Sequence, residues 1–145
     1  GVGGMNHFLL AAPGGQRADR FGAPARYGAY AMELLINRIL TAGSGRKANL
    51  EFKVFGGGVI TPALNDVGAR NLAFLRDFLA AEGYAIASRD VGGSYARRVL
   101  FNPVSGRALV RRLDAGNAAA IARQELQMAR RAPVRAVPEL EVELF

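Results

Sequence analysis

Apolar side chains recur at helical spacing in two long segments of the chain. Over residues 27–42 and again over about residues 66–82, they lie three and four residues apart, as on one face of an α-helix. The first face carries Met32, Leu35, Ile36, Ile39 and Leu40, and the second carries Val67, Leu72, Leu75, Phe78 and Leu79. We therefore predict two amphipathic helices, the first ended by Gly43 and Gly45 and the second by Gly83.

The chain around these helices contains further helix signals and a predicted loop. Asn65 or Asp66 is a suitable N-cap for the second helix. A third helix is expected over about residues 117–131, because Pro133 stops it and one side is largely apolar. Residues 13–25 contain Pro13, Pro24 and three glycines, and this composition predicts a loop.

Strand patterns occupy most of the remaining chain. Residues 49–55 alternate strictly, with Leu50, Phe52 and Val54 on one side, which is typical of a half-buried strand. Buried or edge strands are also predicted over residues 5–10, 84–91 and 139–145. Residues 97–102 and 107–113 form a predicted hairpin, because Asn102–Gly106 between them has turn composition.

The order of these elements predicts a mixed α/β fold. Strand, helix, strand and helix are followed by several strands and a helix. A doubly wound nucleotide-binding fold is disfavoured, because no G-x-G-x-x-G opens a helix after a strand and no Walker A lysine is present. A chain of 145 residues suits one domain.

Composition excludes several kinds of site within this chain. It has no cysteine, so disulfides, zinc–thiolate sites and cysteine nucleophiles are excluded. With His7 as the single histidine, a metal site built from histidines is disfavoured as well. No apolar run reaches the roughly 18 residues typical of a membrane span. The default expectation is a cytoplasmic protein with no membrane insertion.

The net charge of +7 and the pI of about 10.8 favour acidic partners. Nucleic acid is one such partner, but the arginines are spread along the chain and no nucleic-acid-binding motif accompanies them. A GC-rich genome explains an excess of arginine over lysine without any function. We therefore rank nucleic-acid binding low.

A few residues could carry chemistry, and each has a structural alternative. His7 could act as a general base, although a lone histidine is more often structural. Gly56–Gly58 could form an anion nest or a tight turn, of which the turn is the more common case. Asp90 could position a substrate amide with Ser94 and Tyr95 nearby, or could pair with Arg97 or Arg98 at the end of a strand.

Six blocks of the sequence, in order, resemble the CheD family of chemoreceptor glutamine deamidases. The blocks are residues 3–10 (GGMNHFLL), 26–36 (RYGAYAMELLI), 53–58 (KVFGGG), 67–71 (VGARN), 90–99 (DVGGSYARRV) and 101–107 (FNPVSGR). Each block alone is weak, but six in the same order are specific. Gly58, where the family more often has alanine, is a mild departure.

The resemblance implies hydrolysis of glutamine side chains to glutamate on methyl-accepting chemotaxis proteins. It implies a layered α/β sandwich with mixed sheets flanked by helices, and neither a metal nor an organic cofactor. A cysteine nucleophile, a histidine base and an orienting threonine carry the family's reaction. CheC, a phosphatase, is an expected partner besides the receptors.

Of the family's catalytic residues, only His7 can be assigned in this sequence. The cysteine and the threonine belong upstream of the Gly-Gly-x-Asn-His block, so Gly1 is expected to be an internal residue of a longer protein. Residues 1–145 are then a single CheD-like deamidase domain without its N-terminal portion, and residues 114–145 are a C-terminal helix and tail. We expect this exact chain to be inactive; the alternative is a non-catalytic chemotaxis adaptor that binds receptors or CheC.

Overall fold

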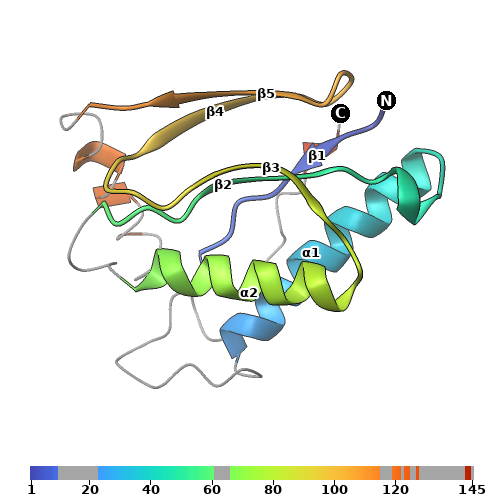
Figure 1. Cartoon of the computed structure of the whole chain (residues 1–145), viewed down its shortest axis with the longest axis horizontal. Coiled ribbons are helices and arrows are strands. Elements are labelled where there is room, and N and C mark those ends of the chain that lie inside the picture. The colour runs from blue at the N-terminus through green and yellow to red at the C-terminus, as the bar shows by residue number, and fades with distance from the viewer. Residues whose placement is uncertain are drawn as a thin grey trace. The chain divides into compact units, whose positions relative to one another are not determined.

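A computed structural model of the chain describes residues 1–9, 23–60 and 66–114, and in addition residues 119–121, 123, 124, 127, 143 and 144. The protein has a mixed α/β architecture, as predicted (Figure 1). In chain order the elements are β1 (Gly4–Met5), α1 (Ala23–Ala42), the 3₁₀ turn η1 (Lys47–Asn49), β2 (Phe52–Gly56), α2 (Val67–Ala81), β3 (Ile86–Val91), β4 (Arg97–Asn102), β5 (Arg107–Arg112) and β6 (Glu143–Leu144).

The described strands form three two-stranded sheets. β2 and β3 are parallel, with α2 as the connection between them. β4 and β5 pair as a hairpin, and β1 pairs antiparallel with β6. Parallel and antiparallel pairing therefore occur together, which confirms the prediction of mixed sheets.

The chain divides into two compact units. The first contains Gly1–Leu50, Leu100–Leu109 and Arg135–Phe145, and the second contains Glu51–Val99 and Val110–Val134. The tip of the β4–β5 hairpin belongs to the first unit and its base to the second.

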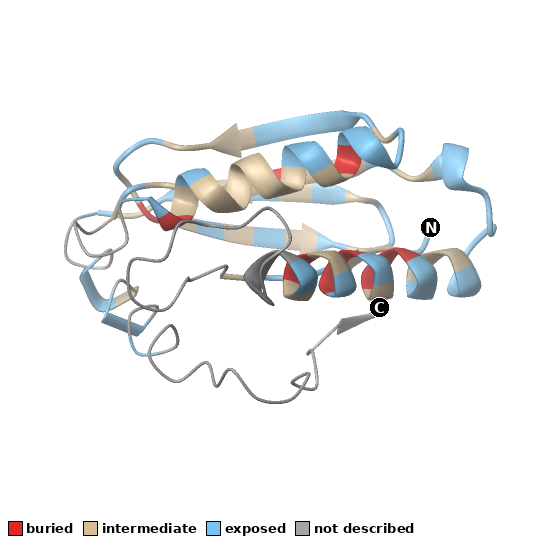
Figure 2. Cartoon of the chain, turned by 90° about the horizontal axis from the view of Figure 1, so that it is seen from below, coloured by how far each residue is buried: buried red, intermediate tan, exposed pale blue. Residues whose placement is uncertain are grey.

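In the first unit, α1 contributes most of the buried apolar surface. Ala31, Met32, Leu35 and Ile36 are buried, and Figure 2 shows the buried positions along one side of this helix. This is the predicted apolar face. The helix begins at Ala23 rather than near residue 27, because Pro24 is compatible with the first helical turn, where its missing N–H has no partner to lose.

The start of the chain differs from its prediction. The sequence pattern predicts a buried strand over residues 5–10, but β1 contains only Gly4 and Met5, and Met5 is 49% exposed. In the described part of the chain, β1 pairs with β6 at two positions, Gly4 with Leu144 and Met5 with Glu143. From Asn6 to Leu9 the described backbone is irregular.

In the second unit, α2 packs along the β2–β3 pair (Figure 1). Val67 and Leu79 on its predicted face are buried, Leu79 with 1% of its surface exposed. The helix ends as expected, because Gly83 takes a φ of +74° and the N–H of Tyr84 donates to the carbonyl of Leu79 at 2.8 Å.

The N-terminus of α2 departs from the prediction. Asp66 occupies the N-cap position but makes no side-chain capping hydrogen bond. Its backbone is already helical, with φ −99° and ψ −15°, and its carboxylate instead pairs with Arg70 one turn later at 2.9 Å. The other predicted cap, Asn65, lies outside the described residues.

The alternation predicted over residues 49–55 is weaker in the structure. Val54 is buried, but Lys53 and Phe55 on the opposite side are also partly buried. A strand paired in parallel, with a crossover helix over its sheet, is covered more evenly than one whose second face meets water. Asn49 belongs to η1 and not to the strand.

The hairpin matches its prediction closely. Two backbone N–H groups of the turn, those of Val104 and Ser105, donate to Oδ1 of Asn102 at 3.0 Å each. The N–H of Gly106 donates to the Asn102 carbonyl at 2.8 Å. The asparagine side chain thus holds the reversal.

Much of the C-terminal region lies outside the described residues. Residues 119–121, 123, 124 and 127 are helical, which fits the third predicted helix at those positions, and Glu143–Leu144 is the described part of the predicted edge strand. Of the loop predicted over residues 13–25, residues 13–22 lie outside the described residues, and residues 23–25 are the start of α1 instead. Among the helices that the structure describes, none combines the length and apolar character that crossing a bilayer requires.

Candidate functional site

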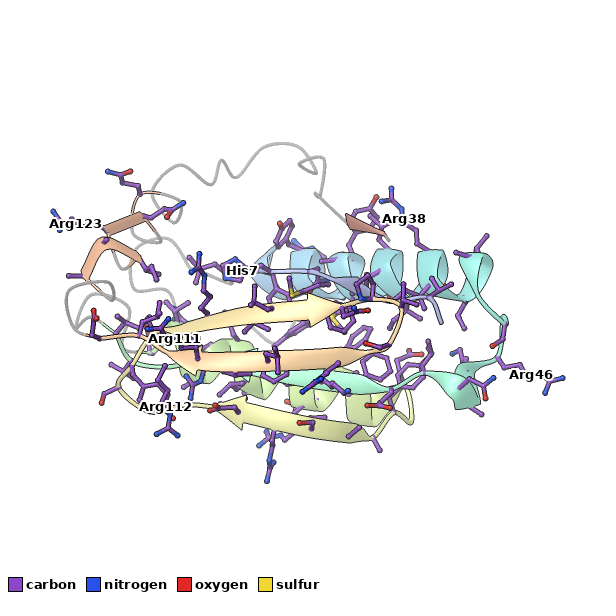
Figure 3. All side chains as sticks on the ribbon, turned by 90° about the horizontal axis from the view of Figure 1, so that it is seen from above. His7, Arg38, Arg46, Arg111, Arg112 and Arg123 are labelled. Atoms are coloured by element: carbon purple, nitrogen blue, oxygen red, sulfur yellow. The ribbon has the colours of Figure 1, made fainter. Side chains whose placement is uncertain are left out.

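His7 follows β1 in the first unit and is exposed to solvent (Figure 3). The residue before it fixes this segment on α1. Nδ2 of Asn6 donates to the carbonyl of Ala31 at 3.2 Å, and Sδ of Met32 lies 3.9 Å from the same nitrogen. The peptide is therefore tied to the buried side of α1, while the imidazole next to it stays accessible to a proton donor or a substrate.

The described residues place no metal-binding set around this histidine or elsewhere: they contain no group of three or more His, Cys, Asp and Glu side chains that could hold a metal ion. The full sequence has no cysteine. A Cys–His pair is therefore not formed within these 145 residues.

In the second unit, two glycine-containing loops meet at the carboxyl ends of β2 and β3. The N–H of Gly92 donates to the carbonyl of Gly56, and the N–H of Val59 donates to the carbonyl of Gly93, both at 2.8 Å. The Gly92 amide is thus engaged by backbone and unavailable to an anion. These bonds join the loop after β2 to the loop after β3, and neither uses an N–H group of Gly56–Gly58, so the tight turn and the anion nest both stay predictions for that segment.

Close backbone approach explains why glycines occupy this junction. A Cβ on Gly57 would lie 2.6 Å from Cγ and Cδ1 of Leu72, and a Cβ on Gly68 would lie 2.7 Å from the Gly57 carbonyl oxygen. A Cβ on Gly58 would come within 3.0 Å of the carbonyl oxygen of Tyr95. The loop after β2 therefore packs directly on the first turns of α2 and on the loop after β3.

A charged cluster completes this end of the second unit. Oδ1 of Asp90 accepts hydrogen bonds from Nε and Nη2 of Arg97, at 3.0 and 2.8 Å. Only 3% of the Arg97 side chain is exposed. The guanidinium groups of Arg97 and Arg112 lie 4.2 and 4.3 Å from the centre of the Tyr95 ring.

The electrostatics of the cluster follow from these contacts. The hydrogen bonds from Arg97, opposed by burial, and the charges of Arg97 and Arg112 lower the pKa of Asp90 below its usual value. A carboxylate that pairs with a nearly buried guanidinium has a structural role, because it compensates the charge of that guanidinium. Of the two roles predicted for Asp90, the structure shows the ion pair at the end of the strand. Its partner is Arg97, whereas Arg98 is exposed.

The candidate site residues predicted from the sequence belong to different units. His7 lies in the first unit, whereas Asp90, Tyr95 and the two glycine loops lie in the second. Sequence reasoning did not single out Asn6 or Arg112. Arg112 could have been found from the predicted hairpin, because pairing of its two strands brings Arg97 and Arg112 opposite one another; no sequence signal connects Asn6 with Ala31.

The known proteins that are similar to this chain carry the same family name. The family model described as CheD chemotactic sensory transduction matches residues 9–112. A protein of Thiobacillus denitrificans is 44% identical over 147 residues, covering 100% of this chain and 72% of its own length. One from Caulobacter vibrioides is 48% identical, with 100% and 74% covered, and one from Caulobacter sp. strain K31 is 52% identical, with 86% and 64% covered. All three are named "Probable chemoreceptor glutamine deamidase CheD".

Proposed function

This chain belongs to the CheD family, and from that premise we propose that it serves the hydrolytic deamidation of glutamine side chains on methyl-accepting chemotaxis proteins. The product is glutamate, which a methyltransferase can then esterify. Cytoplasmic receptor segments are the substrates, CheC is a partner, and the reaction uses no cofactor. Support comes from the family match and from relatives over 40% identical along the whole chain.

The observation that carries the catalytic part of this proposal is the position of His7. Its imidazole is exposed, and its backbone is tethered to α1 through the Asn6 side chain. A general base has to reach both a nucleophile and a substrate, and it has to be held in place while it does so. The exposure and the tether of His7 suit both requirements.

The first half of the reaction forms a thioester. The imidazole of His7 takes the proton of a cysteine thiol, and the thiolate attacks the carbon of the glutamine amide. That cysteine is not among these 145 residues. The imidazolium then protonates the departing nitrogen, so that ammonia leaves and the acyl group stays on sulfur.

The second half of the reaction consumes one water molecule. His7 removes a proton from the water, the resulting hydroxide attacks the thioester, and the thiol leaves with its proton restored. A threonine hydroxyl, supplied from outside these residues, fixes the tautomer of the imidazole. The sum of both halves converts one glutamine and one water into one glutamate and one ammonia.

A non-catalytic role is the second candidate, and the absence of cysteine favours it for this chain taken alone. Without a thiolate the covalent route is closed, and catalysis by the remaining groups falls by orders of magnitude. A chain of this kind could still bind receptors or CheC as an adaptor.

Ammonia release and the mass of a receptor fragment separate the two candidates. We would compare this chain, a longer form that carries the upstream residues of its gene, and the same longer form with His7→Ala. The deamidase proposal predicts product from the longer form alone and a loss of rate of about 10²–10⁴-fold in His7→Ala. Asn37→Ala, at an exposed position of α1, is the matched control and should leave the rate unchanged.

Two results would contradict the deamidase proposal. The longer form could bind receptor and release no ammonia, in which case the adaptor description is correct. His7→Ala could retain full activity, in which case another residue is the base.

A further inference from the structure

The segment that carries His7 is held by few contacts of its own. β1 ends at Met5, and the described ladder between β1 and β6 has two residue pairs. The side chain of His7 itself forms no hydrogen bond or ion pair with any described residue. A short strand rich in glycine specifies its register weakly, and a slip of one residue turns every side chain to the opposite side. A contact outside the ladder is therefore needed to determine which way His7 faces.

The Asn6 side chain makes that contact. Its Nδ2 donates to the carbonyl of Ala31 at 3.2 Å and lies 3.9 Å from Sδ of Met32, and both of these residues are buried. Exposure alternates around it as along a strand: Met5 is exposed, Asn6 is partly buried and His7 is exposed. Side chains that alternate in this way point to opposite sides, so Asn6 against α1 leaves the imidazole on the solvent side (Figure 3).

The helix does not need this hydrogen bond for its own integrity. Inside an α-helix each carbonyl oxygen accepts from the N–H four residues later, and Ala31 lies in the interior of α1. The Asn6 amide therefore uses the second lone pair of an oxygen that already has a partner. Loss of the amide would leave no helix carbonyl without a hydrogen bond, so its effect falls on the segment that carries His7.

The chemical type of the Asn6 side chain matters at this position. A carboxamide nitrogen donates to a carbonyl oxygen, whereas leucine, which has a similar size, has no donor. An ionised aspartate has the same shape as asparagine but only acceptors, and it would face the carbonyl of Ala31 without a proton to share. The contact is therefore specific for a side chain that carries an N–H donor.

We propose that Asn6 is a positioning residue for the reaction, and that its amide fixes the register of the segment after β1 so that the imidazole of His7 faces the nucleophile and the substrate. Asn6 acts through the neighbouring histidine. The inference rests on the proposed function, because it takes His7 as the general base. It predicts that Asn6 contributes to the rate of the chemical steps and not to affinity for the receptor.

Steady-state deamidation by the longer form measures this contribution. Asn6→Leu removes the donor at similar size, and Asn6→Gln keeps the donor on a side chain that is longer by one methylene. We expect Asn6→Leu to lower kcat by about tenfold to a hundredfold, because a displacement of about 1 Å can cost about 10²-fold. KM should stay within about twofold, and Asn6→Gln should recover part of the loss in kcat.

Alkylation of the nucleophilic thiol by iodoacetamide separates positioning from a general loss of structure. A histidine held beside a thiol lowers the pKa of that thiol, so that the thiolate forms and reacts at lower pH. In Asn6→Leu we expect the pH of half-maximal alkylation to move upward, toward the value of about 8.5 for a free cysteine. Once circular dichroism shows that the variant is folded, a merely structural role would leave this midpoint unchanged.

Asn49→Leu is the matched control. It makes the same substitution in the same unit and also removes a hydrogen bond, the one from Nδ2 of Asn49 to Oγ of Ser44 at 3.1 Å. Asn49 lies in η1, outside the segment that carries His7. Its kcat, KM and alkylation midpoint should therefore match those of the unchanged longer form.

Two results would overturn the inference: a folded Asn6→Leu that keeps the kcat and the alkylation midpoint of the unchanged longer form, or an Asn49→Leu that loses as much as Asn6→Leu. If Asn6→Leu does not fold, the same measurements on Asn6→Gln decide, with a loss in kcat of about two- to tenfold expected from the longer side chain.

Failure of the proposed function gives a different result, because the unchanged longer form then releases no ammonia. The alkylation midpoint still tests Asn6 in that case: an upward shift in Asn6→Leu supports its positioning role, and an unchanged midpoint contradicts it. If the longer form is active and His7→Ala keeps full activity, His7 is not the base and the role of Asn6 falls with it.

Discussion

Arg97 shows how a cation is accommodated inside this small protein. A guanidinium that is almost fully removed from water needs a partner for its charge, because its hydration is lost. Asp90 supplies the charge through two hydrogen bonds, and the Tyr95 ring supplies a π-face at 4.2 Å. Arg112 shares the same ring at 4.3 Å, and Asp90 offsets part of the repulsion between the two cations.

This cluster makes stability depend on pH in a defined window. The pKa of Asp90 is lowered in the folded protein, so its ionisation stabilises the fold above the unfolded-state value of about 3.9. That contribution is lost as the pH falls through the lower, folded-state pKa. We therefore predict that Asp90→Asn is less stable than the unchanged chain at pH 7 and that the difference shrinks as the pH falls below about 3.9.

Urea unfolding at several pH values measures this prediction. Asp77→Asn is the control, because Asp77 is more exposed and its partner Arg76 is 73% exposed, so its loss should matter little at any pH. An Asp90→Asn chain as stable as the unchanged one at pH 7 would contradict the role assigned to Asp90.

The sequence limits the partner of Asp90 to Arg97 or Arg98 but does not determine which of the two it is. Alternation along residues 97–102 places Arg97 and Arg98 on opposite faces of the strand, and either face could have been the buried one. Tertiary packing decides in favour of Arg97. The contact between Asn6 and Ala31 joins segments distant in the chain, and no local pattern encodes it.

Among the elements, α2 depends on how closely the loop after β2 approaches it. Gly57 has a φ of +66°, and a Cβ there would overlap the Leu72 side chain. Gly83, after the last turn of the same helix, has a φ of +74°, but a Cβ there would meet no atom within 4 Å. One end of the helix is therefore sterically constrained and the other is open.

The two glycines provide a paired prediction. Alanine at either position would have to adopt the left-handed backbone conformation, which costs about 1–2 kcal/mol. At Gly57 the clash with Leu72 adds about 1–3 kcal/mol of overpacking. We expect Gly57→Ala to lower the free energy of unfolding clearly more than Gly83→Ala does, as measured by urea denaturation. If both variants lost the same free energy of unfolding, the loop after β2 would be able to move away from Leu72 at no cost, and the junction would not be tightly packed.

The sequence predicts regular elements best where their own side chains determine them. The faces of α1 and α2, the end at Gly83 and the hairpin turn at Asn102 follow from local periodicity and turn chemistry. The strand predicted over residues 5–10 fails because a strand needs a partner, and the described ladder for it has two residue pairs. The start of α1 was placed too late for a different reason: a proline such as Pro24 can mark a loop or begin a helix.

Over the whole molecule, charge is unbalanced. The sequence carries 19 basic and 12 acidic side chains, for a net charge of +7. A compact state with such an excess repels itself, and dissolved salt screens that repulsion. Ion pairs at the surface weaken in salt as well, but each contributes only about 0–1 kcal/mol.

We therefore predict that the unfolding temperature rises when NaCl is increased from about 20 to about 200 mM, where the screening length shortens from roughly 20 to below 10 Å. Thermal denaturation followed by circular dichroism is the measurement. A chain with Arg38→Glu and Arg46→Glu, which lowers the net charge, should respond less. A fall in unfolding temperature with salt would mean that favourable ion pairs outweigh the repulsion.

The architecture of the whole chain was predictable in class but not in detail. The order of helical and strand patterns indicates mixed α/β, and the structure agrees. The division into two units could not be anticipated, because it depends on which distant segments touch: residues 100–109 group with the first 50 residues, and their neighbours in the chain do not.

The parallel pairing of β2 with β3 sets an order of events when the chain folds. Pairing of Phe52 with Ile86 closes a long loop, because the whole connection that contains α2 lies between them. Closing a long loop costs conformational entropy, so this contact forms slowly. The β4–β5 hairpin needs only the short Asn102–Gly106 reversal, and hairpins of this kind close in about 1–10 μs. The hairpin should therefore be present early, and the parallel pair should limit the rate at which the second unit reaches its native state.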